Sequence, residues 1–211
     1  TMIPLSLFLP VLNENSYIRY VDQMVFELVC KMIQESIQKG MKMVPISFNL
    51  SKASFEDEPF MQEYMKVFQQ FDIPKEYIEF ELLESISMDN SDKLIKVVDT
   101  IHKAGFRCAL DDFGSGYSSM SVLARVPIDI IKLDRSLFQN PYRDIDNFLI
   151  VDGLLDILHH FPVQIVAEGV EDETVAEHMR QHGCDMIQGF YYYRPMPMDE
   201  FQRLIAEQGE C

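Results

Sequence analysis

Basic residues are scarce in this sequence. Its 18 lysines and arginines stand against 34 aspartates and glutamates, and the formal net charge is −16 at pH 7. A surface of this sign repels the phosphates of nucleic acids and of anionic lipids. We therefore exclude a nucleic-acid polymer as a partner of the bulk surface. An acidic site can still bind an anionic ligand where metal ions reverse the local field.

Cysteines and long apolar runs are also scarce. The four cysteines are scattered, without the spacing of a metal site, as Cys30, Cys108, Cys184 and Cys211. This usage favours a reducing, cytoplasmic setting with structural thiols. The sequence shows no apolar run long enough to span a bilayer and no charged-then-apolar leader. We expect a cytoplasmic protein, or the cytoplasmic part of a membrane-anchored one.

Short apolar runs alternate with amphipathic helical patterns along the 211 residues. The predicted strands are 43–49, 78–84, 106–111, 129–134, 163–168 and 185–189. The predicted helices are 17–39, 58–70, 92–104, 118–125, 144–160, 172–182 and 198–208. Because no hairpin signal or linker interrupts this alternation, it predicts one α/β domain over residues 1–211 with a parallel sheet. Six strands fit an open α/β sheet, and they are two fewer than the eight of a closed (β/α) barrel.

Polar residues mark the end of each predicted strand. In chain order they are Asn49, Glu81, Asp111 with Asp112, Lys132 with Asp134, Glu168 and Gln188. A single Asp-Asp-x-Gly is more typical of a capped turn than of an active site. Six polar strand ends in succession favour a site, because α/β enzymes place their chemistry at this edge of the sheet. Carboxylate and amide oxygens suit Mg²⁺ or Mn²⁺, and adjacent aspartates can serve two ions.

The sequence DDFGSGYSS at residues 111–119 resembles the signature loop of the EAL-domain family, the bacterial cyclic di-GMP phosphodiesterases. Further segments resemble motifs of that family in the same order, namely FNLS at 48–51, ELLE at 81–84, IKLDR at 131–135, VAEGVE at 166–171, IQGF at 187–190 and RPMP at 194–197. Leu83 stands where the family usually has threonine. The resemblance covers essentially the whole chain.

This resemblance implies a role for each matching residue. It implies that two Mg²⁺ or Mn²⁺ ions are bound by Asn49, Glu81, Asp111, Asp112 and Glu168. It implies a catalytic role for Asp112, Glu168 and Lys132, with Lys132 holding the attacking water and the phosphate oxygens. Supporting or substrate-binding roles fall to Glu84, Asp134, Glu171, Gln188 and Ser115.

The Glu-Ala-Leu triplet that names the family does not occur in this chain. The segment FLP at residues 8–10 resembles the one that follows the triplet in the family. The resemblance therefore implies an α/β fold, an incomplete TIM-like (β/α) barrel that lacks the first two strands. We expect a domain that is truncated before this motif, within a longer bacterial signalling protein. The 211 residues alone should then hydrolyse substrate weakly or not at all. Strand 43–49 would be an open edge, which favours a homodimer.

Three functions are consistent with these features. The first is a metal-dependent phosphodiesterase that converts cyclic di-GMP to linear pGpG. The second is a catalytically inactive EAL-like module that binds cyclic di-GMP or a protein partner. The third is an unrelated Mg²⁺-dependent barrel enzyme acting on a carboxylate substrate. The aromatic run FYYY at 190–193 could contact guanine, but core packing is the commoner fate of such a run.

Overall fold

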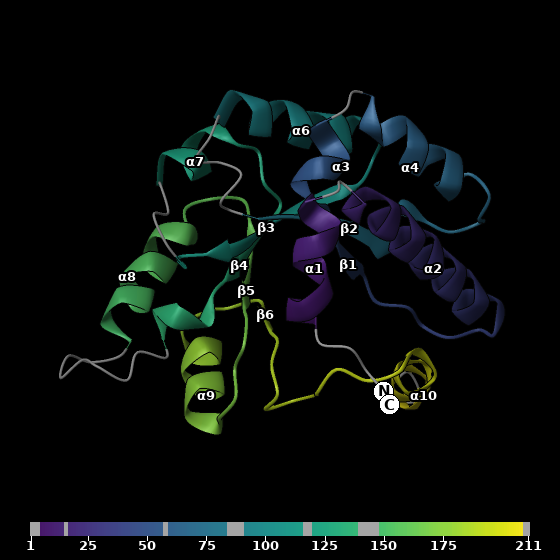
Figure 1. The fold of residues 1–211 in the computed structure, drawn as a ribbon. Coiled ribbons are helices and arrows are strands. Elements are labelled where there is room, and N and C mark those ends of the chain that lie inside the picture. The colour runs from purple at the N-terminus through teal and green to yellow at the C-terminus, as the bar shows by residue number, and fades with distance from the viewer. Residues whose placement is uncertain are drawn as a thin grey trace. The chain divides into compact units, whose positions relative to one another are not determined.

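The computed structural model describes residues 5–14, 17–56, 59–83, 91–115, 120–138 and 148–208. The strands of these residues form one six-stranded parallel sheet in which they follow one another in chain order (Figure 1). They are β1 Ile46–Asn49, β2 Ile78–Leu83, β3 Arg107–Phe113, β4 Ile130–Leu133, β5 Gln164–Ala167 and β6 Met186–Ile187. This six-stranded α/β half-barrel confirms the predicted incomplete TIM-like fold.

Helices connect the strands and confirm each predicted helical segment within the described residues. They are α1 Leu5–Glu14, α2 Ile18–Gln38, α3 Lys52–Glu56, α4 Phe60–Phe68, α6 Ser91–Lys103, α7 Met120–Arg125, α8 Leu149–Leu158, α9 Glu173–Gln181 and α10 Met198–Gln208. Short 3-10 helices form at η1 Lys75–Tyr77 and η2 Arg135–Leu137. The sequence did not predict α1, which contains Pro10, or α3, which is too short to show a period. Among the described helices, none combines the length and apolarity that a membrane crossing requires.

The chain divides into two compact units. The first contains Thr1–Glu81, Asp99–Phe106 and Met196–Cys211, and the second contains Leu82–Val98 and Arg107–Pro195. The prediction that residues 1–211 act as one domain stays a prediction.

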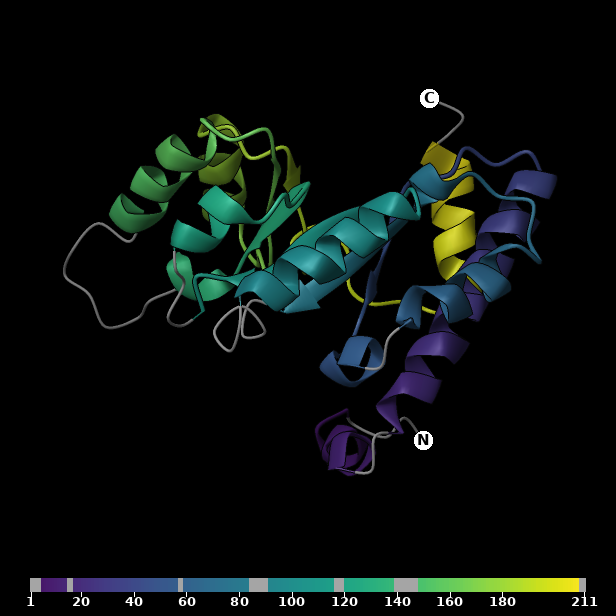
Figure 2. The same cartoon turned by 90° about the horizontal axis from the view of Figure 1, so that it is seen from above.

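Aromatic rings form the core of the first unit. The ring of Phe26 in α2 lies 5.5 Å from Phe48, 5.1 Å from Tyr64 and 5.7 Å from Phe80, measured between centroids. All four side chains are buried. Edge-to-face and tilted contacts of this kind add to the burial of apolar area. On another part of the same unit, α10 lies beside α2 (Figure 2), where Gln202 Nε2 donates to Ser36 Oγ at 2.9 Å.

Aliphatic side chains form the core of the second unit, where Ala109, Ile130 and Val166 pack together across β3, β4 and β5. Two aspartates fix the beginnings of its strands. Asp129 precedes β4 and accepts the Cys108 N–H at 2.7 Å, and Asp185 precedes β6 and accepts the Ile165 N–H at 2.7 Å. These carboxylates satisfy backbone donors, so they belong to the sheet and not to a ligand site.

We expect Phe26→Ala to lower the free energy of unfolding by about 3–5 kcal/mol, because it leaves a cavity among buried rings. Urea unfolding followed by circular dichroism measures this loss. Leu28→Ala in the same helix is the matched control, since Leu28 is 48% exposed. It should change the free energy by less than about 1 kcal/mol. Equal losses in the two variants would contradict the aromatic core described above.

Candidate active site

A β-bulge brings the two adjacent aspartates to the same part of the sheet. Leu110 of β3 pairs with Ile131 of β4, and Phe113 pairs with Leu133, so the register shifts between these pairs. Asp111 and Asp112 therefore oppose the single residue Lys132. In a regular strand, consecutive side chains point to opposite faces, and a bulge removes this restriction. The prediction that this strand ends at residue 111 is wrong, because the bulged chain continues in β3 to Phe113.

The backbone at Asp112 is in the left-handed region. Its φ is 57°, and among the described residues no other non-glycine residue has a positive φ. Aspartate tolerates this region better than most residues because its short polar side chain can bond locally. Gly114 follows with a φ of 94°, and a Cβ there would lie 2.5 Å from a methyl carbon of Leu137. Ser115 N–H donates to Asp112 O at 3.1 Å and closes the turn.

Lys132 is the buried cation of the site and is only 6% exposed. Its Nζ lies 2.5 Å from Glu168 Oε1 and 3.3 Å from Asp111 Oδ1. Burial of an ammonium group is costly unless opposite charges surround it. The ion pairs therefore fix Nζ between the end of β3 and the residue that follows β5. Sequence reasoning placed all three residues at strand ends but did not identify this pairing.

The carboxylates of the site fit a divalent cation. Asp111, Asp112 and Glu168 each offer an oxygen, and these oxygens all lie within 4.8 Å of one another. Lys132 can balance only one of the three negative charges. Asp111 Oδ1 is buried and forms no hydrogen bond of ordinary geometry with a described residue. Oxygen ligands with excess negative charge are what Mg²⁺ and Mn²⁺ prefer.

Asn49 and Glu81 lie in the first unit. They are directly paired in the β1–β2 ladder, and Leu50 N–H donates to Glu81 O at 2.9 Å. In-register residues of parallel strands point to the same face, so these two side chains are neighbours. Glu81 is buried, whereas Asn49 is exposed. Their role as metal ligands stays a prediction.

The proposed supporting residues have structural contacts of their own. Asp134 Oδ1 accepts the Ser136 N–H at 2.9 Å and caps η2, and Glu171 Oε1 lies 3.4 Å from Arg135 Nη1 at an exposed position. The backbone of Gln188 bonds to Ala167 and Val170, and its side chain is exposed, as is that of Ser115. Glu84 and residues 116–119 lie outside the described residues. Substrate contacts of these residues stay predictions.

The aromatic run after β6 is exposed. Phe190, Tyr191, Tyr192 and Tyr193 are each 40–50% exposed, so the interpretation of this run as core is wrong. The turn before it requires Gly189, because a Cβ there would lie 2.0 Å from Val170 O. The Arg194 guanidinium carbon lies 4.7 Å from the centroid of the Phe190 ring, a cation–π contact. The run thus offers ring surface at the carboxyl end of the sheet's last strand.

The described cysteines are structural, as the sequence predicted. Cys30, Cys108 and Cys184 form no disulfide. Burial raises the pKa of Cys30 and of Cys184 to about 12, and it raises the pKa of Cys108 above its usual range. These groups are therefore thiols at neutral pH, and thiols are poor nucleophiles and poor metal ligands.

The chain is similar in sequence to known proteins. The sequence pattern of the EAL domain matches residues 1–195. Signaling protein YkoW of Bacillus subtilis is 29% identical over 201 residues, which are 95% of this chain and 25% of YkoW. Cyclic di-GMP phosphodiesterase PdeB of Shewanella oneidensis is 30% identical over 168 residues, which are 78% of this chain and 20% of PdeB. The chain thus spans a quarter or less of the length of these two relatives.

The chain is also similar to solved structures. The PaMucR phosphodiesterase in complex with c-di-GMP superimposes with a TM-score of 0.87 at 28% identity. The match covers 94% of this chain and 81% of that one.

We expect Lys132→Met to lower the free energy of unfolding by about 3–5 kcal/mol in metal-free buffer, because it leaves buried carboxylates without their cation. Arg135→Met is the matched control three residues later. Its ion pair with Glu171 is exposed and should contribute less than about 1 kcal/mol. Urea unfolding of both variants measures the difference. Equal, small losses would show that the Lys132 ion pairs do not hold the site together.

Proposed function

Because the chain belongs to the EAL domain family, we propose that the protein hydrolyses one phosphodiester bond of cyclic di-GMP to give linear pGpG. The observation that carries this proposal is the group of Asp111, Asp112 and Glu168 around the buried Lys132. The similarity to PdeB, a cyclic di-GMP phosphodiesterase, and to PaMucR, a phosphodiesterase in complex with c-di-GMP, supports it. Family membership also removes the reason to consider an unrelated barrel enzyme acting on carboxylates.

The EAL family is typically metal-dependent, and the acidic cluster fits this requirement. Asp111, Asp112 and Glu168 would hold Mg²⁺ or Mn²⁺, and Asn49 and Glu81 join them in the proposed ligand set through the family resemblance. When bound, two such ions lower the pKa of water and stabilise the charge that develops on the phosphate. The carboxylates favour hard divalent cations. They repel anions, so an anionic substrate would bind there only through the bound cations.

Lys132 is the proposed positioning and charge-stabilising group. An ammonium group donates hydrogen bonds and accepts none, so it can orient a water oxygen or a phosphate oxygen. Asp111 and Glu168 hold Nζ in place before substrate arrives. Such preorganisation reduces the entropy that would otherwise be lost when the reacting atoms are aligned.

The exposed aromatic run is the proposed guanine-contacting surface. Phe190 and the three tyrosines present ring faces and edges on which a purine can stack. Gln188 precedes them and adds an amide that can donate and accept hydrogen bonds. Glu84, Asp134, Glu171 and Ser115 complete the proposed supporting set. A homodimer and attachment to further signalling domains remain predictions.

The test uses the whole protein in which these residues occur, with cyclic di-GMP and Mg²⁺ or Mn²⁺. Chromatography of the products should show pGpG, and EDTA should abolish its formation. We expect Glu168→Gln and Asp111→Asn each to lower kcat by about 10²-fold or more, because each removes a metal-binding charge. The control is Glu177→Gln, an exposed residue of α9 that pairs with Arg180.

Two results would argue against catalysis. Hydrolysis that persists in EDTA, or at the wild-type rate in both active-site variants, would remove the acidic cluster from the mechanism. Equilibrium binding of cyclic di-GMP by the wild type without any pGpG would identify the alternative, a catalytically inactive binding module.

A further inference from the structure

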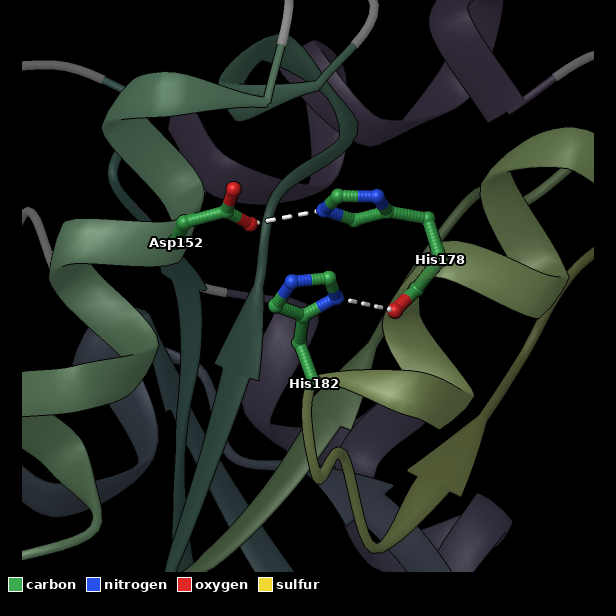
Figure 3. Close-up of side chains that lie close together, drawn as sticks. All are labelled: Asp152, His178 and His182. Carbon is green, nitrogen blue, oxygen red and sulfur yellow. Dashed lines mark hydrogen bonds and ion pairs between the residues drawn. The ribbon is translucent and has the colours of Figure 1, made fainter.

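A second cluster of candidate ligands lies on helices, apart from the strand ends. Asp152 of α8 faces His178 of α9 and His182, which directly follows α9 (Figure 3). His178 Nε2 lies 2.6 Å from Asp152 Oδ1. One ligand atom from each of the three residues lies within 4.8 Å of the other two. The two histidines are four residues apart, so a helical turn places them on one face.

The hydrogen bond of His182 leaves one of its ring nitrogens ready to bind a metal. His182 Nδ1 lies 2.9 Å from the backbone oxygen of His178 (Figure 3). A carbonyl oxygen only accepts, so Nδ1 carries a hydrogen, and in the neutral ring Nε2 then carries the lone pair. Metal-binding histidines usually donate their other ring N–H to a carbonyl or carboxylate in this way. The contact therefore sets the tautomer that a metal requires.

Stacking fixes the orientation of the imidazole rings. The His178 ring lies parallel to the Phe148 ring, at 3.7 Å between centroids and 14° between planes. It also stacks on His182 at 4.0 Å and 17°. The side chains of His178 and Asp152 are only 18% and 32% exposed, whereas His182 is exposed. An ion that both imidazoles bind must lie in both ring planes, which stacked parallel rings do not share. Binding would therefore turn the exposed His182 ring out of the stack, while His178 and Asp152 stay ordered.

We propose that Asp152, His178 and His182 bind a divalent transition-metal ion of the zinc class. Two imidazole nitrogens and one carboxylate oxygen suit Zn²⁺ and disfavour Mg²⁺, which prefers oxygen. Tetrahedral zinc places its ligand atoms about 3.3 Å apart, a spacing that requires the His182 ring to rotate away from the His178 ring. The ion would take the place of the hydrogen between His178 and Asp152, and water would complete its shell. It would link α8 to α9.

The test is a calorimetric titration of the whole protein with Zn²⁺, with Mg²⁺ in excess to reduce zinc binding at the acidic cluster. We expect one equivalent of Zn²⁺ to bind to the wild type. His182→Gln and Asp152→Asn should each weaken this binding by about 10-fold or more, because each removes one of three ligands. Since His182 is exposed at a helix end, its substitution should leave the fold intact.

His160→Gln is the matched control. His160 is an exposed histidine of the same unit whose Nδ1 lies 2.8 Å from Asp156 O, outside the cluster. It should retain the wild-type affinity. Zn²⁺ should also raise the urea midpoint of the wild type and of His160→Gln, and it should raise that of His182→Gln less. Absence of zinc binding in the wild type, or equal affinities in wild type and His182→Gln, would overturn the proposal. None of these measurements depends on cyclic di-GMP or its hydrolysis.

Discussion

The buried ammonium group of Lys132 sets the main constraint on the candidate active site. Removing an isolated charge from water costs several kcal/mol, and only close opposite charges offset this cost. The carboxylates of Asp111 and Glu168 provide them, at 3.3 Å and 2.5 Å. Asp111 lies in β3 and Glu168 directly follows β5, the two strands that flank β4. The pairing therefore requires the parallel order β3-β4-β5 and its register. The strand order therefore brings the three charges together, and their ion pairs stabilise that order. A shift of one residue in either ladder would bury a charge without its partner.

The bulge in β3 is the second constraint, because it resolves a conflict between strand geometry and chemistry. Two adjacent aspartates in a regular strand would point to opposite faces, and one carboxylate would enter the apolar core. The register shift and the φ of 57° at Asp112 let both carboxylates approach Glu168. Asparagine, aspartate and glycine tolerate this backbone best, but of these only aspartate carries a negative charge. The residue type at 112 thus satisfies a backbone requirement and a ligand requirement together.

Several features could be predicted from the sequence because they depend on local patterns. Alternating apolar runs and helical periods predicted the strands and a parallel sheet, and the polar residues at the strand ends predicted the edge of the sheet where the candidate site lies. The bulge could not be predicted, since the period of two assumes a regular strand. The exposure of Tyr191 to Tyr193 contradicted the expectation from average aromatic burial. The spacing of His178 and His182 was visible in the sequence, but their partner Asp152 lies 26 residues before His178 and is brought there only by the packing of two helices.

The carboxylates of this fold have different contacts, and therefore different roles, in three places. Asp129 and Asp185 precede strands and receive backbone N–H groups, so their charge is used within the sheet. Asp111, Asp112 and Glu168 lie at strand ends, where three negative charges meet one ammonium group and a hard cation can balance the remainder. Asp152 instead faces imidazole nitrogens, which favour a softer ion. The two clusters therefore differ in the ligand atoms that they offer to an ion. A metal ion at the helices would link α8 to α9 within the second unit, and it would use none of the strand-end carboxylates.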